Sequence, residues 1–194
     1  FDTPAATEGP PTARCLIVVT PDAQRTMNTF LGASQYLPPA ALDLDLIRSA
    51  RILYLEGYLW DPEQPRAAMR AAIDAARAAG REIAFTLSDA FVINRHREDF
   101  LTLIEQGAID ILFSNETEIM ALAQTDDVEA AIARFADKLP TLVVTRSERG
   151  ALAMRHGERH EVAAAPVAQV LDTTGAGDLF AAGFLTGHVR GKAP

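Results

Sequence analysis

The sequence predicts an α/β protein in which a mainly parallel sheet is flanked by helices. Short apolar segments rich in β-branched residues alternate along the chain with segments whose apolar residues recur at helical spacing. Such alternation is typical of parallel strands joined by right-handed helical crossovers. The length of 194 residues fits one domain at roughly 150 residues per domain, so we expect residues 1–194 to form a single domain.

Strands are expected wherever a short apolar run is bounded by turn residues. Cys15 lies in the first run and is interpreted as a small buried apolar residue. Gly157, between two later runs, indicates a hairpin turn. The expected strands are residues 15–20, 25–31, 52–55, 82–87, 109–113, 142–145, 151–155, 159–163 and 167–171.

Helices are expected where the apolar spacing changes to three and four residues. The clearest case covers residues 63–79, where Met69, Ala72, Ile73 and Ala76 share one face and Gly80 stands at the position of a C-terminal cap. Further helices are expected at residues 43–49, 97–106, 128–139 and 178–189.

Composition excludes several classes of protein. The chain has 18 Lys and Arg against 26 Asp and Glu, a formal charge of −8, which argues against a nucleic-acid partner. No apolar run approaches the ~20 residues that span a bilayer, so no membrane partner is expected. The single cysteine excludes an internal disulfide and a cysteine-rich zinc site. Residues 1–12 contain no apolar signal core, and we expect a cytoplasmic protein.

The strongest functional signal is the sequence DTTGAGD at residues 172–178, which is followed by an apolar helical segment. Glycines between a strand and a helix let backbone N–H groups converge, and the helix dipole adds to the attraction for an anion. A carboxylate at Asp178 would repel that anion, unless it faces a substrate hydroxyl that attacks a phosphate. The alternative is that Asp178 only caps the helix.

Two other nucleotide-binding motifs are excluded. A dinucleotide-binding G-x-G-x-x-G would need glycine where Phe180 stands, which argues against an oxidoreductase of that class. A Walker loop needs Ser or Thr after Gly191-Lys192, where the sequence has Ala193.

DTTGAGD followed by an apolar helix resembles the C-terminal signature of the ribokinase-like (PfkB-type) sugar and nucleoside kinases. The resemblance implies transfer of the γ-phosphate of ATP, with Mg²⁺, to a hydroxymethyl group. It implies that Asp178 is the general base and that the backbone of Gly175, Ala176 and Gly177 forms the anion hole.

A second motif, NETE, begins at Asn115 after an expected strand. Asn115 and Glu118 are three residues apart on the first turn of a helix, so both can face one ligand. The pair resembles the N-x-x-E motif of the same family, which implies that it organises magnesium and phosphate largely through water. Magnesium keeps several waters and takes few protein carboxylates. The alternative is a capping box, and the two interpretations are compatible.

A third motif runs from Thr145 to Gly150 and resembles the family's T-x-G-x-x-G loop, which contacts the nucleotide phosphates. Ser147 replaces the middle glycine, so close approach of the backbone at that position is an open point. Alone, the loop is equally well explained as a solvated turn after a strand.

Two further residues come from weaker resemblances. Arg25, in QRTM, matches a stretch of the adenosine-kinase-like branch in which arginine reaches toward the transferring phosphate. The alternative is a lone surface arginine. Glu56 begins the stretch Glu56-Gly57-Tyr58 at the end of an expected strand, where some family members contact the substrate. Trp60 and Tyr58 are otherwise interpreted as packing residues or cleft wall.

The family resemblance also implies a small-molecule sugar or nucleoside as partner, and it is compatible with a homodimer. Members of this family are longer at both ends, so we expect an incomplete domain that lacks an N-terminal lid and substrate segment and the C-terminal end. The alternative function is a non-catalytic nucleotide- or sugar-binding relic on the same fold.

Overall fold

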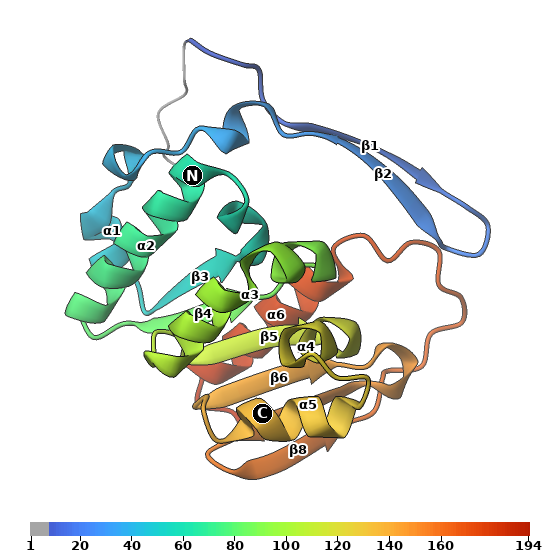
Figure 1. Ribbon diagram of the computed structural model, residues 1–194. Coiled ribbons are helices and arrows are strands. Elements are labelled where there is room, and N and C mark those ends of the chain that lie inside the picture. Colours follow the sequence, from blue (N-terminus) through green and yellow to red (C-terminus); the bar gives the residue numbers. More distant parts are fainter. Residues whose placement is uncertain (1–7) are drawn as a thin grey trace.

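The computed structural model describes residues 8–194; residues 1–7, which begin the segment expected to hold no signal core, lie outside the described residues. A six-stranded sheet with the order β3-β4-β5-β6-β7-β8 forms the centre (Figure 1). A separate two-stranded sheet, β1-β2, extends from one side. The strands are β1 Arg14–Val19, β2 Arg25–Phe30, β3 Ile52–Glu56, β4 Glu82–Thr86, β5 Ile111–Asn115, β6 Thr141–Thr145, β7 Ala151–Arg155 and β8 Glu158–Val162.

The central sheet confirms the predicted alternation of strands and helices. Strands β3 to β6 are parallel, and β7 and β8 continue the sheet as an antiparallel hairpin. The hairpin turns through His156 and Gly157, whose φ angles are 50° and 82°. Positive φ at both positions of a two-residue turn matches the right-handed twist of the flanking strands.

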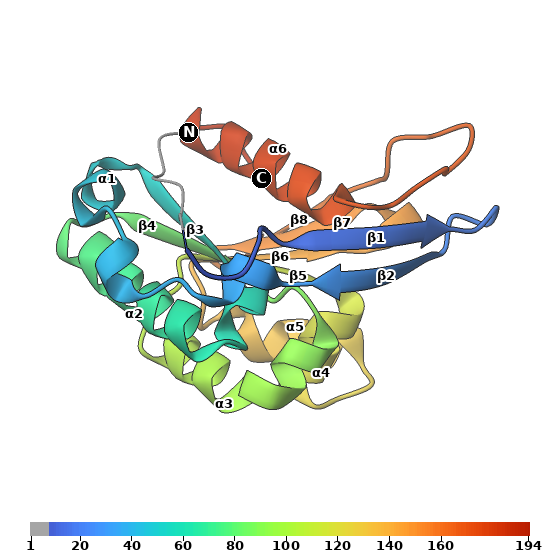
Figure 2. The same cartoon turned by 90° about the horizontal axis from the view of Figure 1, so that it is seen from above.

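Helices cover both faces of the sheet. In Figure 2, α2, α3, α4 and α5 lie on one face, whereas α6 crosses the other. The helices are α1 Leu44–Ser49, α2 Glu63–Ala78, α3 Ala90–Glu105, α4 Glu116–Ala123, α5 Val128–Ala136 and α6 Ala176–Val189. Among residues 8–194, none of these helices has the length and apolarity that a membrane crossing requires.

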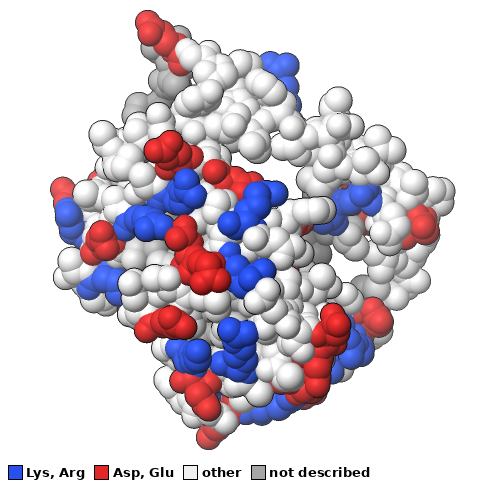
Figure 3. Space-filling view, viewed as in Figure 1, with Lys and Arg blue, Asp and Glu red and all other residues white. Residues whose placement is uncertain are grey.

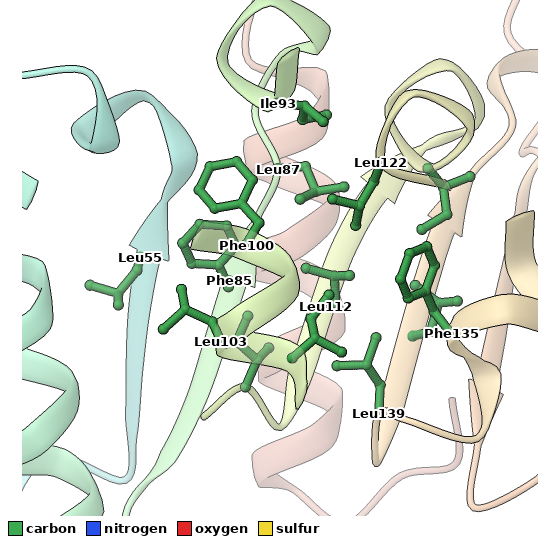
Figure 4. Packing of buried hydrophobic residues seen from close by; sticks show 14 of the residues in the cluster. Leu55, Phe85, Leu87, Ile93, Phe100, Leu103, Leu112, Leu122, Phe135 and Leu139 are labelled. Carbon is green, nitrogen blue, oxygen red and sulfur yellow. The ribbon is translucent and has the colours of Figure 1, made fainter. Parts of the chain in front are cut away.

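The main core lies between the sheet and α2 to α5 (Figure 4). Phe85 of β4 and Phe100 of α3 are fully buried, and their rings meet edge to face at 5.2 Å between centroids. Trp60 is also fully buried and packs against both rings, which confirms that it is a packing residue. Its indole N–H donates to Asp99 Oδ2 at 2.8 Å, so its polar edge is satisfied.

The β1-β2 hairpin is apolar but not buried. Leu16 and Val18 on β1 are 74% and 64% exposed, and Phe30 on β2 is 51% exposed. Figure 3 shows this part of the surface with few charged side chains and separated from the body by an opening. The expectation that Cys15 is buried is therefore wrong: the residue is exposed, because among the described residues β1 pairs only with β2, and all residues of both strands are exposed.

Two other expectations need correction. The helix expected over residues 97–106 begins at Ala90, because Asp89 caps it by accepting a hydrogen bond from the Phe91 amide at 2.7 Å. The strand expected over residues 167–171 is not formed. Val167 and Leu171 are 69% and 71% exposed, and without a neighbouring strand edge a β-branched apolar run has nothing to pair with.

Candidate active site

The carboxyl ends of the parallel strands bring several predicted residues to one edge of the sheet. Glu56 ends β3, Asn115 ends β5 and Thr145 ends β6. In the strand register Asn115 is the direct partner of Thr145, so the motifs at residues 115–118 and 145–150 are neighbours. Ligands of open α/β sheets bind beyond this edge.

The DTTGAGD loop leads into the first turn of α6. Gly175 is the N-cap residue with φ 74° and ψ 6°, a left-handed conformation that glycine adopts without strain. Asp172 shapes the preceding turn, because its Oδ1 accepts from the Thr174 amide at 2.8 Å and from the Thr174 hydroxyl at 2.7 Å.

Asp178 stands in the first turn of α6, and no side chain makes a capping hydrogen bond to this helix. The interpretation of Asp178 as a helix cap is therefore wrong for this structure. Its carboxylate is exposed at the start of the helix, where it is available for contact with a ligand.

The predicted anion hole is partly occupied by the loop's own backbone. The Ala176 amide donates to the Thr173 carbonyl at 3.2 Å, so an anion must compete with that carbonyl or bind the neighbouring amides. The space beside Gly177 is open: a Cβ built there would meet no atom within 4 Å. Gly177 does not have a positive φ, so what this glycine provides is free space.

Arg25 reaches the same loop from the β1-β2 hairpin. Its Nη1 donates to the Thr173 hydroxyl at 2.5 Å, and its charge helps to lower the pKa of Asp172, after the hydrogen bonds from Thr174. Figure 1 shows this end of the hairpin over the segment that precedes α6. Arg25 is therefore not a lone surface arginine.

The Asp178 charge acts on two side chains of β3, those of Glu56 and Tyr54. Burial raises the pKa of the Glu56 carboxyl, and the nearby Asp178 charge raises it further. The hydroxyl of Tyr54 responds to the same pair: burial, Glu56 and Asp178 raise its pKa to about 12. The structure thus brings Glu56 and Asp178 together, although they are far apart in the sequence.

Asn115 and Glu118 form a full capping box at the start of α4. Glu118 Oε2 accepts from the Asn115 amide at 3.0 Å, and Asn115 Oδ1 accepts from the Glu118 amide at 2.8 Å. Asn115 Nδ2 also donates to Glu118 Oε1 at 2.7 Å. Glu118 is only 8% exposed, and burial raises its pKa, with a further increase from Asp89. Each carboxylate oxygen keeps a second lone pair for another ligand.

The loop at residues 145–150 is tightly folded. The Arg146 amide donates to the Gly150 carbonyl at 2.8 Å, which closes the loop. Gly150 has φ 90°, and a Cβ there would lie 1.9 Å from the Val162 carbonyl oxygen, so only glycine fits. Ser147 has φ 52°, a left-handed conformation that glycine adopts more readily than serine.

Sequence reasoning missed Asp89 at this edge and gave Tyr58 no specific role beyond its place next to Glu56. Burial and the charges of Asp89, Glu118 and Glu56 raise the pKa of Tyr58, and Arg25 lowers it. Tyr58 therefore lies among side chains from four different segments, and it is 54% exposed. The sequence did contain a signal for Asp89: it is a polar residue shortly after the end of β4, at the same edge of the sheet as Asn115, which ends β5. Tyr58 could be named only as packing or a cleft wall.

The structure also has a cavity away from this edge. It has a volume of about 460 Å³ and is lined by α2 and α3 residues that include Arg70, Arg77 and Asp99. None of the predicted site residues lines it. The candidate site is instead an open edge of the sheet, bounded by α6, α4 and the β1-β2 hairpin.

The fold and this edge define a ribokinase-like α/β protein, with a mostly parallel sheet flanked by helices. The profile described as "pfkB family carbohydrate kinase" matches residues 5–194. The chain therefore belongs to the pfkB family of carbohydrate kinases, which confirms the family resemblance.

Solved structures support the same assignment. An adenosine kinase from Sinorhizobium meliloti superposes with a TM-score of 0.96 at 45% identity, over 100% of this chain and 59% of that one. A probable sugar kinase from Rhizobium etli CFN 42 gives a TM-score of 0.91 at 45% identity, over 94% of this chain and 56% of that one.

Among curated proteins, a cytidine kinase from Thermococcus kodakarensis is 37% identical over 101 residues, which are 50% of this chain and 35% of the relative. The chain thus spans between about a third and three fifths of these three proteins, 35%, 56% and 59% of their lengths.

Proposed function

We propose that the protein carrying this chain is an ATP-dependent kinase that transfers the γ-phosphate to a hydroxymethyl group of a sugar or nucleoside. The observation that carries the proposal is the position of Asp178: it caps nothing, it stands at the start of α6 beside the glycine loop, and it lies near Glu56. A carboxylate beside an anion hole is unfavourable unless a hydroxyl group lies between them. The kinase names of the similar proteins support the proposal.

Asp178 is proposed as the general base. Its carboxylate accepts the proton of the substrate hydroxyl as that oxygen forms a bond to the γ-phosphorus, and the bond to the β-phosphate oxygen breaks to release ADP. The amides at the start of α6 and the guanidinium of Arg25 would stabilise the charge that spreads over the transferring group. Arg25 is held near this point by its bond to Thr173.

The nucleotide is proposed to bind along residues 145–150, with Thr145 and Gly150 facing its phosphates and Asn115 beside them. The side chains around these residues determine how a divalent cation would be held. The described residues contain no group of three or more side chains able to hold a metal, so magnesium would bind chiefly to phosphate and water, with Glu118 as the nearby carboxylate. When bound, magnesium would neutralise charge on the phosphates.

For the acceptor, we propose the adenosine-kinase-like branch, with a nucleoside as the first candidate. The 45% identity to the Sinorhizobium meliloti adenosine kinase supports this choice, as does the hydrogen bond from Arg25 to Thr173 in the DTTGAGD loop. Glu56 and Tyr58 would face the acceptor, because Glu56 lies near Asp178, and Tyr58 lies near Glu56 and Arg25. A half-exposed tyrosine ring is suited to stacking on a planar base.

The direct test is ATP consumption by the full-length protein with a panel of nucleosides and sugars. The expected result is magnesium-dependent formation of ADP with one or a few acceptors, and a nucleoside among the best. Binding of ATP or of an acceptor without any phosphorylated product would instead identify a non-catalytic relic and would refute the kinase proposal.

A further inference from the structure

Glu116, which neither the family motif nor the proposed chemistry uses, lies between the two nucleotide-side motifs. It is the first residue of α4, directly after Asn115. Its carboxylate accepts a short hydrogen bond from Arg149 Nη2, and its Oε1 lies 3.5 Å from Arg146 Nε. Both arginines belong to the loop at residues 145–150. One carboxylate therefore connects the start of α4 to both ends of that loop.

These contacts differ from ordinary surface ion pairs, which contribute little. The side chains of Glu116 and Arg146 are only 20% and 18% exposed. Glu116 Oε1 is buried without a hydrogen bond, so a small movement of Arg146 Nε toward it would complete one. A partly buried carboxylate between two guanidinium groups is favourable only while both stay in place, because losing either one leaves a desolvated charge less well paired.

The loop needs such external support. Ser147 and Gly150 both have positive φ angles, 52° and 90°, and for serine that conformation is locally unfavourable. The loop's internal hydrogen bonds are few: Arg146 to Gly150, Arg149 to Arg146 and Gly150 to Ser147. A strained conformation persists only where its surroundings determine it, and Glu116 provides two such contacts.

We propose that Glu116 is a positioning residue for nucleotide binding: by holding Arg146 and Arg149 it fixes the loop at residues 145–150 in the conformation that receives the phosphates. The proposal rests on the proposed kinase function. The loop would contact the nucleotide equally in the ground state and in the transition state, so its distortion weakens binding and leaves the chemical step unchanged.

The matched control lies at the other end of the same chain of ion pairs. Arg146 Nη1 also lies 3.3 Å from Glu161 on β8, and Arg159 bonds both Glu161 and Glu129 of α5, the latter at 2.6 and 3.0 Å. Glu129 touches no residue of the loop through these bonds. Glu129→Gln thus removes the same charge from the same network without releasing the loop.

The test compares Glu116→Gln, Arg149→Met and Glu129→Gln in the full-length protein. For Glu116→Gln we expect the KM for ATP to rise roughly three- to tenfold, with kcat and the acceptor KM within about twofold of wild type. Arg149→Met, at a side chain that is 55% exposed and tolerant of substitution, should raise the KM for ATP in the same direction. Glu129→Gln should leave it unchanged.

Hydrogen exchange supplies a second readout that needs no catalysis. Without nucleotide, Glu116→Gln should accelerate exchange of the amides of residues 146–150, and Glu129→Gln should not. Unchanged exchange in that loop, an unchanged KM for ATP, or a fall in kcat with a shifted magnesium requirement would each overturn the positioning role. A wild-type protein that consumes no ATP, but whose loop responds in exchange as described, would refute the kinase proposal alone.

Discussion

Replacing Asp178 with asparagine separates catalysis from structure, because this carboxylate makes no hydrogen bond to any residue from 8 to 194. Asp178 is exposed in the first turn of α6, and the N-cap position belongs to Gly175. Asparagine has nearly the same size and retains an acceptor oxygen. It cannot take the proton of a substrate hydroxyl.

The size of each effect follows from these surroundings. The lost attraction between the Asp178 charge and the helix dipole costs about 0.3–1 kcal/mol in free energy of unfolding. Removing the repulsion with Glu56, whose pKa Asp178 raises, offsets part of that cost. A missing general base lowers kcat by about 10²–10⁴, which corresponds to roughly 2.7–5.5 kcal/mol in activation free energy. The effect on kcat is therefore several times larger than the effect on stability.

The assay is steady-state ATP turnover with the best acceptor, together with thermal unfolding of the same preparations. Asp137→Asn serves as the control, because Asp137 is an exposed residue at the C-terminal end of α5, which leads to the amino end of β6 and so lies opposite the edge that carries the site. We expect a large loss of kcat only in Asp178→Asn, with ATP affinity equal or better. A near-normal kcat in that variant would refute the proposed mechanism. A lowered Tm with kcat preserved would show that the residue serves stability alone.

Three further variants test other parts of the site. Gly177→Val should keep the fold, because a Cβ at this position meets no protein atom within 4 Å. It should abolish turnover, because the side chain fills the space for phosphate. Unchanged ATP affinity and rate would contradict the anion hole. Glu118→Gln should raise the magnesium concentration for half-maximal rate. The raised pKa of the Glu118 carboxyl also means that its contribution to stability is present below about pH 4.5, its unfolded value, and is lost as pH rises through the higher folded pKa. The stability of wild type relative to Glu118→Gln should therefore decrease from acidic to neutral pH in denaturant titrations, and a constant difference would argue against a buried, titrating carboxylate. Arg25→Met should lower kcat at least about tenfold if the guanidinium contacts the transferring phosphate, whereas a change in stability alone would limit Arg25 to its bond with Thr173.

Much of the fold could be predicted because β3, β4 and β5 are short apolar runs and a helix follows each of them before the next strand. Asp127 and Asn115 cap α5 and α4, and Gly80 follows α2 with φ 66°. Predictions failed where the burial or pairing of a segment depends on residues far away in the sequence. Residues 167–171 and Cys15 have the composition of buried strands, but burial requires a second surface, and composition does not show whether one is present.

The residues of the candidate site also fall into two groups: those that a local motif predicts and those that only the fold brings together. Asp178, Gly175 and Glu118 could be predicted as site residues because they stand in short local motifs. The contact between Arg25 and Thr173 joins residues that are 148 positions apart, and no local pattern encodes it. Glu116 was missed for a related reason: its contacts are with arginines of another segment, which only the folded chain brings close.

The charges at the sheet edge affect a charged nucleotide and a neutral acceptor differently. Glu56, Glu118 and Asp178 contribute carboxylates from three elements, and the raised pKa values of Glu56 and Glu118 show that their negative charge is already costly there. A polyphosphate adds more charge of the same sign to this edge. Arg25 and the positive end of α6 compensate in part. A divalent cation on the phosphates would remove most of the remaining repulsion, so nucleotide binding should depend on it, whereas a neutral sugar or nucleoside meets no such barrier at Asp178.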